Sequence, residues 1–368
     1  MTQPTNQAAW LIEPDSPLKV DVAPLPRAGP GELVVKNAAV AINPLDCHMQ
    51  DSGIFVQKWP AILGCDVAGE VYEVGSEVLR FQKGDRVIGY ASCHAPEKGG
   101  FYADFRFLLR HAVNLVSGRP QDGAFALYTV IMADKAAILP DSIPFTDGVV
   151  VPFALEAAVC ALSLKISGIA MPGVSTPALG LPYPSVNNVA PSGKVLVVYG
   201  GSSSVGSMTT QLATAAGIDV ITIVGKHNFE LSKRCGATQV IDRHDPLITD
   251  KIIEAVGKSD LIGIFDAIAT PETYDNDLAI LTKLGGGYLA SVHPPPPALP
   301  DNVKGGMIFA VNDIVTPVWK AYVTPGLQAG KLQCLPPPTI VGKGLEHINE
   351  ALKMSKAGVS ATKLVVEL

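Results

Sequence analysis

A turn of small residues follows a short apolar segment near the middle of the chain. Segment and turn together read KVLVVYGGSSSVG, from Lys194 to Gly206. Small residues let a ligand approach the backbone, and the N–H groups at the start of a following helix attract an anion. The candidate contacts are Gly200, Gly201, Ser202, Ser203, Ser204 and Val205. This pattern predicts a site for the pyrophosphate of a dinucleotide.

Basic residues stand where a typical NAD site carries a carboxylate. Lys226, His227 and Asn228 follow a predicted strand at residues 219–224, and Arg243 follows another at 239–242. A carboxylate there accepts hydrogen bonds from the ribose hydroxyls, whereas cations neutralise a 2′-phosphate. We therefore predict NADPH rather than NADH as the cofactor. The alternative is a solvated basic turn.

The elements around the small-residue turn form a predicted βαβ unit. A helix is expected over residues 205–216, ending at Gly217 and followed at once by the strand 219–224. Ser203 occupies the place of the middle glycine of the usual three-glycine pattern, so this context carries the prediction. An ordinary strand–turn–helix of an α/β protein is the alternative.

Length and composition bound the class of protein. The chain has 368 residues, 48% hydrophobic and 17% charged, which predicts a globular protein of two domains. A net charge of −6 and the lack of a Lys/Arg-rich run argue against nucleic acid or an anionic membrane as partner. The polar N-terminus lacks the apolar region of a signal peptide, so a cytosolic protein with a small-molecule partner is expected.

The first hundred residues predict a β-rich module, with strands at 31–41, 67–74 and 86–90. Four motifs occur in and after this module. They read NPLD from Asn43, LGCDVAGEV from Leu63, KGDRV from Lys83 and DGAFA from Asp122. In this order, and followed by the small-residue turn, they resemble the medium-chain dehydrogenase/reductase superfamily over nearly the whole chain.

This resemblance implies an α/β protein with two domains. A β-rich, GroES-like catalytic domain would span residues 1–157 and be completed by 318–368, with a closing strand at 364–366. A doubly wound Rossmann domain that binds NADP would span 158–317, and the active site would lie in the cleft between the two.

The sequence departs from the zinc enzymes of the superfamily. Pro44 stands at the first cysteine ligand, Cys65 and Asp66 replace a His-Glu pair, and residues 153–156 offer no cysteine. Cys65, Asp66 and His48 are competent ligand types in principle. We expect instead that Cys65 packs and Asp66 braces a turn, and we predict no metal. Six scattered cysteines without a C-x-x-C pair also argue against a disulfide framework or a zinc lobe.

Within the zinc-free branch, three segments look like the stand-alone enoyl reductases of fungal polyketide pathways. They read LGLPYPS from Leu179, YGGSS from Tyr199 and KHNFEL from Lys226. Such enzymes act in trans on a chain held by the carrier protein of a polyketide synthase. NADPH supplies a hydride to the β-carbon of an unsaturated thioester, and a proton reaches the α-carbon. Two alternatives share the fold: a quinone or enone reductase for free substrates, and a non-redox polyketide-binding cyclase or scaffold.

Two residues are candidate proton donors or acceptors. His48 takes the place of a lysine that relatives carry two positions after the first motif, and histidine titrates near neutral pH. Glu156 precedes Ala157, which replaces a threonine that usually touches the cofactor. The alternatives are a structural histidine and a glutamate that pairs at a helix start. The resemblance also places Asn43 near the nicotinamide, and Asp46 is expected to brace the turn.

Two further segments bear on partners. Residues 98–119 are rich in Lys and Arg and could face an acidic carrier domain, or form a solvated loop. Four prolines at 294–297 follow an apolar strand predicted at 287–292, where they would hinder pairing between sheet edges. A monomer is therefore expected.

Overall fold

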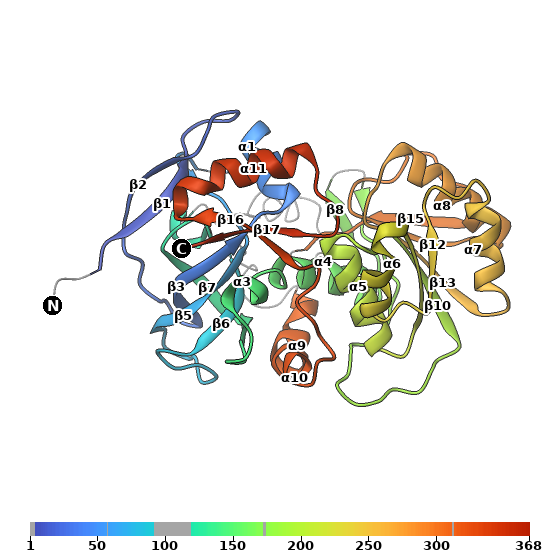
Figure 1. The fold of residues 1–368 in the computed structure, drawn as a ribbon, viewed down its shortest axis with the longest axis horizontal. Coiled ribbons are helices and arrows are strands. Elements are labelled where there is room, and N and C mark those ends of the chain that lie inside the picture. Colours follow the sequence, from blue (N-terminus) through green and yellow to red (C-terminus); the bar gives the residue numbers. More distant parts are fainter. Residues whose placement is uncertain (1–3, 57, 92–118, 172–173, 311–312) are drawn as a thin grey trace. The chain divides into compact units, whose positions relative to one another are not determined.

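The computed structural model describes residues 4–56, 58–91, 119–171, 174–310 and 313–368. The chain forms two compact units (Figure 1). Unit 1 comprises Met1–Phe153, Trp319–Thr324 and Pro337–Leu368, and unit 2 comprises Ala154–Val318 and Pro325–Pro336.

Four strands of unit 1 close into a ring. They are β3 (Glu32–Ala41), β5 (Asp66–Val74), β6 (Arg86–Ala91) and β7 (Tyr128–Ile138). Each pairs antiparallel with the next, and β3 also pairs with β7, which leaves no open edge between them. The strands predicted at 31–41, 67–74 and 86–90 are thereby confirmed.

The end of the chain extends this ring. β17 (Lys363–Glu367) pairs antiparallel with β3, with Val365 opposite Ala41, and β16 (Pro338–Lys343) lies beyond it. The closing strand predicted at 364–366 is confirmed. The helices of unit 1 are α1 (Pro44–Ser52), α3 (Phe145–Gly148) and α11 (Ile348–Ala357).

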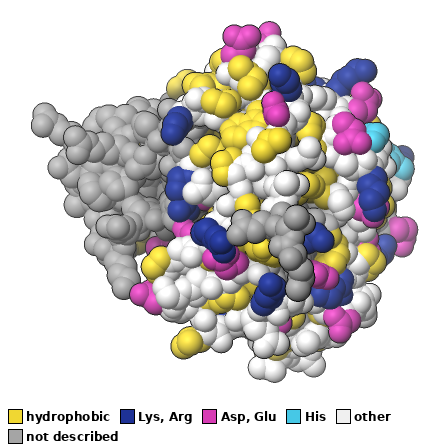
Figure 2. Space-filling view, turned by 90° about the vertical axis from the view of Figure 1, so that its left-hand side faces the viewer, with side chains coloured by type: hydrophobic (Ala, Val, Ile, Leu, Met, Phe, Trp, Pro, Cys, Tyr) yellow, Lys and Arg dark blue, Asp and Glu magenta, His cyan; other side chains and the backbone are white. Residues whose placement is uncertain are grey.

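A three-stranded sheet in unit 1 has the order β2-β1-β4. Its strands are β1 (Asn6–Leu11), β2 (Lys19–Ala23) and β4 (Ala61–Ile62). β2 is an edge strand, and four of its five residues are exposed. On the face of unit 1 in Figure 2, side chains of both charges are interspersed, with hydrophobic side chains gathered toward the top.

Unit 2 is built on a parallel sheet of order β12-β11-β10-β13-β14-β15. Counted from β10, this is the strand order of doubly wound dinucleotide-binding domains, so the predicted fold class is confirmed. The elements are β10 (Lys194–Tyr199), α5 (Ser204–Ala215), β11 (Asp219–Val224), α6 (Phe229–Arg234), β12 (Gln239–Asp242), α7 (Ile248–Val256), β13 (Asp260–Asp266), α8 (Pro271–Lys283), β14 (Gly287–Ser291) and β15 (Val303–Met307).

Shorter elements complete the chain. They are α4 (Pro152–Ser163), β8 (Ile169–Met171), β9 (Val174–Ser175), α9 (Thr316–Val318), the π-helical turn Trp319–Val323 and α10 (Thr324–Gln328). The stretch Phe145–Ser163 is long and apolar enough to cross a membrane, but 78% of its apolar 18-residue window is buried inside the protein. It includes α3 and α4 and is typical of a core segment.

Candidate functional site

The predicted small-residue turn joins β10 to α5. Gly200 has a φ of +76°, which favours glycine, and its N–H donates to the Ile223 carbonyl of β11 at 2.9 Å. Ser203 caps α5, because its Oγ accepts the N–H of Gly206 at 3.1 Å. The helix therefore begins at Ser204, one residue before the predicted start. We call residues 200–206 the glycine–serine turn.

Two positions of this turn require glycine because neighbouring atoms lie too close to leave room for a side chain. A Cβ on Gly206 would lie 2.2 Å from the carbonyl oxygen of Gly200, and one on Gly201 would lie 2.7 Å from the Cβ of Thr222. Neither position has room for a larger residue. The glycine–serine turn is thus held tightly against β11, with the start of α5 next to it.

A hydrogen bond links the glycine–serine turn to the basic segment after β11. Ser202 is nearly buried, and its Oγ accepts from Nδ2 of Asn228 at 3.1 Å. Lys226, His227 and Asn228 form a 3₁₀ turn directly after β11. The Oγ of Ser204 is buried and has no hydrogen-bond partner in the described part of the chain. An unpaired hydroxyl at a helix start suits a ligand with oxygen acceptors.

Exposed cations gather at the carboxyl ends of β11 and β12. Val224 lies opposite Asp242 in the sheet, and Nζ of the exposed Lys226 is 3.6 Å from Oδ2 of Asp242. Arg243 is also exposed, and its Nε contacts Nε2 of His244 at 3.0 Å. His244 was not among the predicted contacts, although its place directly after Arg243 is visible in the sequence.

These residues fit a dinucleotide. The predicted contacts of unit 2 all lie at the carboxyl edge of the parallel sheet, where doubly wound proteins bind ligands. The small residues of the glycine–serine turn and the start of α5 suit a pyrophosphate, and the cations after β11 and β12 suit a further phosphate. Asn43 belongs to unit 1, and its predicted place near the nicotinamide stays a prediction.

Four buried polar side chains form a cluster in unit 1. Asn43, Asp46, Asp66 and Lys363 are at most 3% exposed, and we call them the unit 1 polar cluster. Asn43 caps α1, and its N–H donates to Oδ2 of Asp46 at 2.8 Å. This capping contact confirms that Asp46 braces the turn before α1.

Asp66 is the centre of the unit 1 polar cluster. Its Oδ2 accepts from Nδ2 of Asn43 at 2.8 Å and lies 3.1 Å from Nζ of Lys363. Its Oδ1 accepts the N–H of Phe153, in the first turn of α4, at 2.6 Å. Lys363 also donates to Oδ1 of Asn43. Sequence reasoning missed Lys363, whose only local signal is a charge at the start of an apolar strand.

Burial changes the protonation of Asp46. Loss of hydration raises the pKa of its carboxyl group to about 7, and the charge of Asp66 acts in the same direction. The N–H of Asn43 and the ammonium of Lys363 oppose this shift. Asp46 therefore exchanges its proton near neutral pH.

The two candidate proton donors differ in exposure. His48 lies on α1, one turn after the capping residues, and is exposed. Glu156 lies on α4 and is fully buried. His48 belongs to unit 1 and Glu156 to unit 2. The catalytic assignment of both residues stays a prediction.

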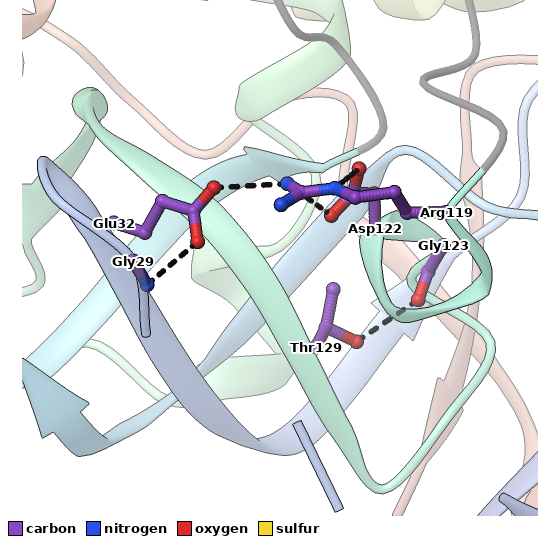
Figure 3. A network of polar contacts seen from close by, with 6 residues as sticks. All are labelled: Gly29, Glu32, Arg119, Asp122, Gly123 and Thr129. Atoms are coloured by element: carbon purple, nitrogen blue, oxygen red, sulfur yellow. Dashed lines mark hydrogen bonds and ion pairs between the residues drawn. The ribbon is translucent and has the colours of Figure 1, made fainter. Parts of the chain in front are cut away.

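Arg119, the last residue of the predicted basic stretch, makes internal ion pairs (Figure 3). Its guanidinium donates to Oδ1 and Oδ2 of Asp122 at 2.8 and 2.9 Å, and to Oε1 of Glu32 at 2.9 Å. Oε2 of Glu32 accepts the N–H of Gly29, and Thr129 donates to the Gly123 carbonyl nearby. Arg119 thus braces unit 1. Residues 98–118, the rest of the proposed carrier contact, lie outside the described residues.

Two family models match the sequence. One, described as "Alcohol dehydrogenase GroES-like domain", matches residues 29–141. The other, described as "Zinc-binding dehydrogenase", matches residues 204–300.

Curated relatives match over the full length of the chain. "Dehydrogenase orsE" of Emericella nidulans is 69% identical over 367 residues, covering 99% of each chain. "Trans-enoyl reductase himH" of Aspergillus japonicus is 33% identical over 370 residues, covering 99% of this chain and 97% of the relative.

Solved structures share the fold. A mycobacterial protein complexed with NADPH has a TM-score of 0.68 at 21% identity, covering 99% of this chain and all of the other. The CurK enoyl reductase has a TM-score of 0.70 at 14% identity, covering 98% and 99% of the two chains.

The residues present do not fit the zinc that one family description names. In the part of the chain that the structure describes, no three His, Cys, Asp or Glu side chains gather around a common point. Asp66 pairs with Lys363, and a lysine at 3.1 Å opposes a metal cation there. Cys65 is buried, as are Cys47, Cys160 and Cys235. Cys93 lies outside the described residues.

Proposed function

This chain belongs to the medium-chain dehydrogenase/reductase superfamily, and from that membership we propose that it is an NADPH-dependent, trans-acting enoyl reductase. Its substrate would be an α,β-unsaturated polyketide thioester on the carrier protein of a polyketide synthase. Superfamily membership makes the protein an oxidoreductase, and the relative named trans-enoyl reductase supports the reaction and the partner. The observation that carries the proposal is the glycine–serine turn, because its small residues and the helix start that follows suit the pyrophosphate of a dinucleotide.

The cofactor proposal rests on charge at the strand ends. Lys226 and Arg243 are exposed after β11 and β12, and a lysine and a histidine replace the carboxylate expected at an NAD site. His244 lies beside Arg243 and is a further polar group at these strand ends. Residues 158–317 would thus form the NADP-binding domain, and residues 1–157 with 318–368 the catalytic domain.

Each set of residues has its own task in this proposal. When bound, NADPH supplies the hydride that adds to the β-carbon. The glycine–serine turn and the start of α5 bind and orient the pyrophosphate. His48 gives its imidazole proton to the α-carbon, so that hydride and proton together saturate the double bond. Glu156 is the second candidate for proton transfer.

We also propose that the protein acts as a cytosolic monomer. β15 is an outer strand of the unit 2 sheet, and a Cβ on Gly306 would lie 2.5 Å from the backbone nitrogen of Pro177. The segment Ser175–Pro177 therefore packs on one face of β15. The four prolines at 294–297 follow the neighbouring strand β14 and cannot donate to a further sheet ladder, which disfavours pairing with a second copy of the chain.

The test mixes the purified protein with NADPH and an enoyl-pantetheine thioester, following absorbance and product mass together. A gain of two hydrogens coupled to NADPH consumption is expected, with slower turnover when NADH replaces NADPH. Tight NADPH binding without turnover on several thioesters would instead indicate the non-redox scaffold. Comparable turnover of a simple enone without a carrier would indicate a reductase for free substrates.

A variant tests the proton donor. His48→Gln should lower kcat by about 10²- to 10⁴-fold, the usual contribution of a positioned acid. NADPH affinity, measured by fluorescence, should stay at the parent value. A variant as active as the parent across pH 5–9 would remove His48 from the mechanism.

A further inference from the structure

The unit 1 polar cluster brings together four segments that are distant in sequence. Asp66 opens β5, Asn43 follows β3, Lys363 opens β17 and Phe153 lies in the first turn of α4. The pairing of β3 with β5 and β17 explains why Asn43, Asp66 and Lys363 lie close together. Ala41 lies opposite both Asp66 and Val365, so the antiparallel register carries Lys363 to the level of Asn43.

Each carboxylate oxygen of Asp66 accepts a hydrogen bond from a residue at the start of a different helix. Oδ2 binds the side chain of Asn43, the residue that caps α1. Oδ1 binds the N–H of Phe153, a first-turn donor of α4 that has no partner within its own helix. α1 carries His48 and α4 carries Glu156. One carboxylate thus contacts the starts of both helices that carry the proposed proton-transfer groups.

Stability alone is a weak explanation for this arrangement. A buried ion pair often stabilises a protein no more than well-packed apolar side chains of similar size, because both charges lose their hydration. A buried carboxylate that accepts three donors does fix the directions of its partners. The contacts of Asp66 are therefore better suited to orient the start of α1 than to strengthen unit 1.

We propose that Asp66 is a positioning residue that sets the orientation of α1, and with it His48, with Lys363 as its counter-charge. This inference rests on the proposed function, because it assigns a purpose to the placement of His48. Asp66 does not touch substrate or cofactor in this proposal. It acts through Asn43 and the capped start of α1.

Two variants separate positioning from stability. Asp66→Asn replaces one acceptor oxygen by an N–H₂ group. Since donors face both oxygens of Asp66, this group faces another donor in either orientation of the amide. The variant also leaves the ammonium of Lys363 buried without its carboxylate. The double variant Asp66→Asn/Lys363→Met removes both charges and should recover much of the lost stability. Glu73→Gln is the matched control, since Glu73 lies on the same strand in a surface ion pair with Arg27 at 3.1 Å.

The experiment measures kcat and the imidazole NMR signal of His48 in all variants. The chain has seven histidines, and the signal of His48 is assigned by its loss in His48→Gln. Both Asp66 variants should lower kcat by about 10- to 100-fold, the scale of a misplacement near 1 Å, and displace this signal. Glu73→Gln should change neither.

The double variant decides between the two roles. If it has the parent kcat and the parent imidazole signal, Asp66 and Lys363 serve only the fold and the proposal is overturned. The NMR signal needs neither substrate nor cofactor. If the parent protein fails to reduce any enoyl thioester, the proposed function is lost, and the signal still shows whether Asp66 positions His48.

Discussion

The glycine–serine turn of unit 2 and the unit 1 polar cluster differ in where their charges lie: near the turn the charges are exposed, and in the cluster they are buried. The turn contains no charged side chain, has closely packed glycines, and lies near cations that are exposed. The unit 1 polar cluster fills its space and pairs its charges inside the protein. The first arrangement suits a ligand that brings its own charge, and the second suits a fixed geometry. Substitutions should therefore affect binding in one region and stability in the other.

The largest effect should come from removing the buried lysine. Lys363→Met leaves the carboxylate of Asp66 buried without its cation, which should lower the free energy of unfolding by about 3–5 kcal/mol. Lys343→Met is the matched control in neighbouring β16, where Lys343 pairs with Glu367 at the surface. It should cost at most about 1 kcal/mol. Equal losses in urea titrations of the two variants would contradict the contrast.

The titration of Asp46 should make stability depend on pH. The pKa of Asp46 is raised to about 7 by burial, so the folded protein holds this proton more tightly than the unfolded chain. Its stabilising contribution is thus complete at low pH and declines as pH rises from about 4 to about 7. Relative to Asp46→Asn, the parent should lose about 1.4 kcal/mol of unfolding free energy per pH unit in this window. Parallel curves at pH 5 and 6.5 would contradict the shift.

A single methyl group should damage the glycine–serine turn. Gly206→Ala places a Cβ 2.2 Å from the Gly200 carbonyl oxygen, so the turn must move. Such overpacking costs about 1–3 kcal/mol, which would weaken NADPH binding by about 5- to 150-fold. Gly168→Ala is the control, since its new Cβ would meet only the Thr176 hydroxyl at 3.3 Å. Calorimetric titration with NADPH measures both variants.

The smallest effect should come from the exposed cations. Lys226→Ala should weaken NADPH binding about fivefold, or about 1 kcal/mol, and leave NADH binding and stability unchanged. Lys233→Ala removes a lysine from α6 that pairs with Glu230 at 2.8 Å, and it should change neither affinity. An equal loss for NADH and NADPH after Lys226→Ala would show that Lys226 does not read the 2′-phosphate.

Local patterns were enough to predict much of the fold. β3, β5 and β6 are short apolar runs between turn residues, and β10, α5 and β11 follow one another around a glycine turn. In each case the residues that decide the structure are neighbours in sequence. The small sheet of β1, β2 and β4 was not predicted. Its edge strand β2 reads KVDVA, which alternates polar and apolar residues over only five positions, and β4 has two residues, so each segment is too short for a firm prediction from sequence.

The unit 1 polar cluster shows what sequence patterns leave open. Asp66 was expected to cap or brace a turn, and its observed partners depend on the pairing of strands far apart in the chain. Lys363 lies 320 residues after Asn43 and reaches it only through the register of β17 on β3. No local signal contains that register. The exposure of His48 and the burial of Glu156 likewise follow from packing.

The pairing of β17 with β3 also determines the order in which the two units can fold during synthesis. Unit 2 is built almost entirely from residues 154–318, so its sheet is complete while the last strand is still inside the ribosome. Asp66 leaves the ribosome early, and its lysine arrives only with β17. Unit 1 therefore begins to be synthesised first and completes its fold last. In a chain truncated before Lys363, Asp66 would be buried without its counter-charge.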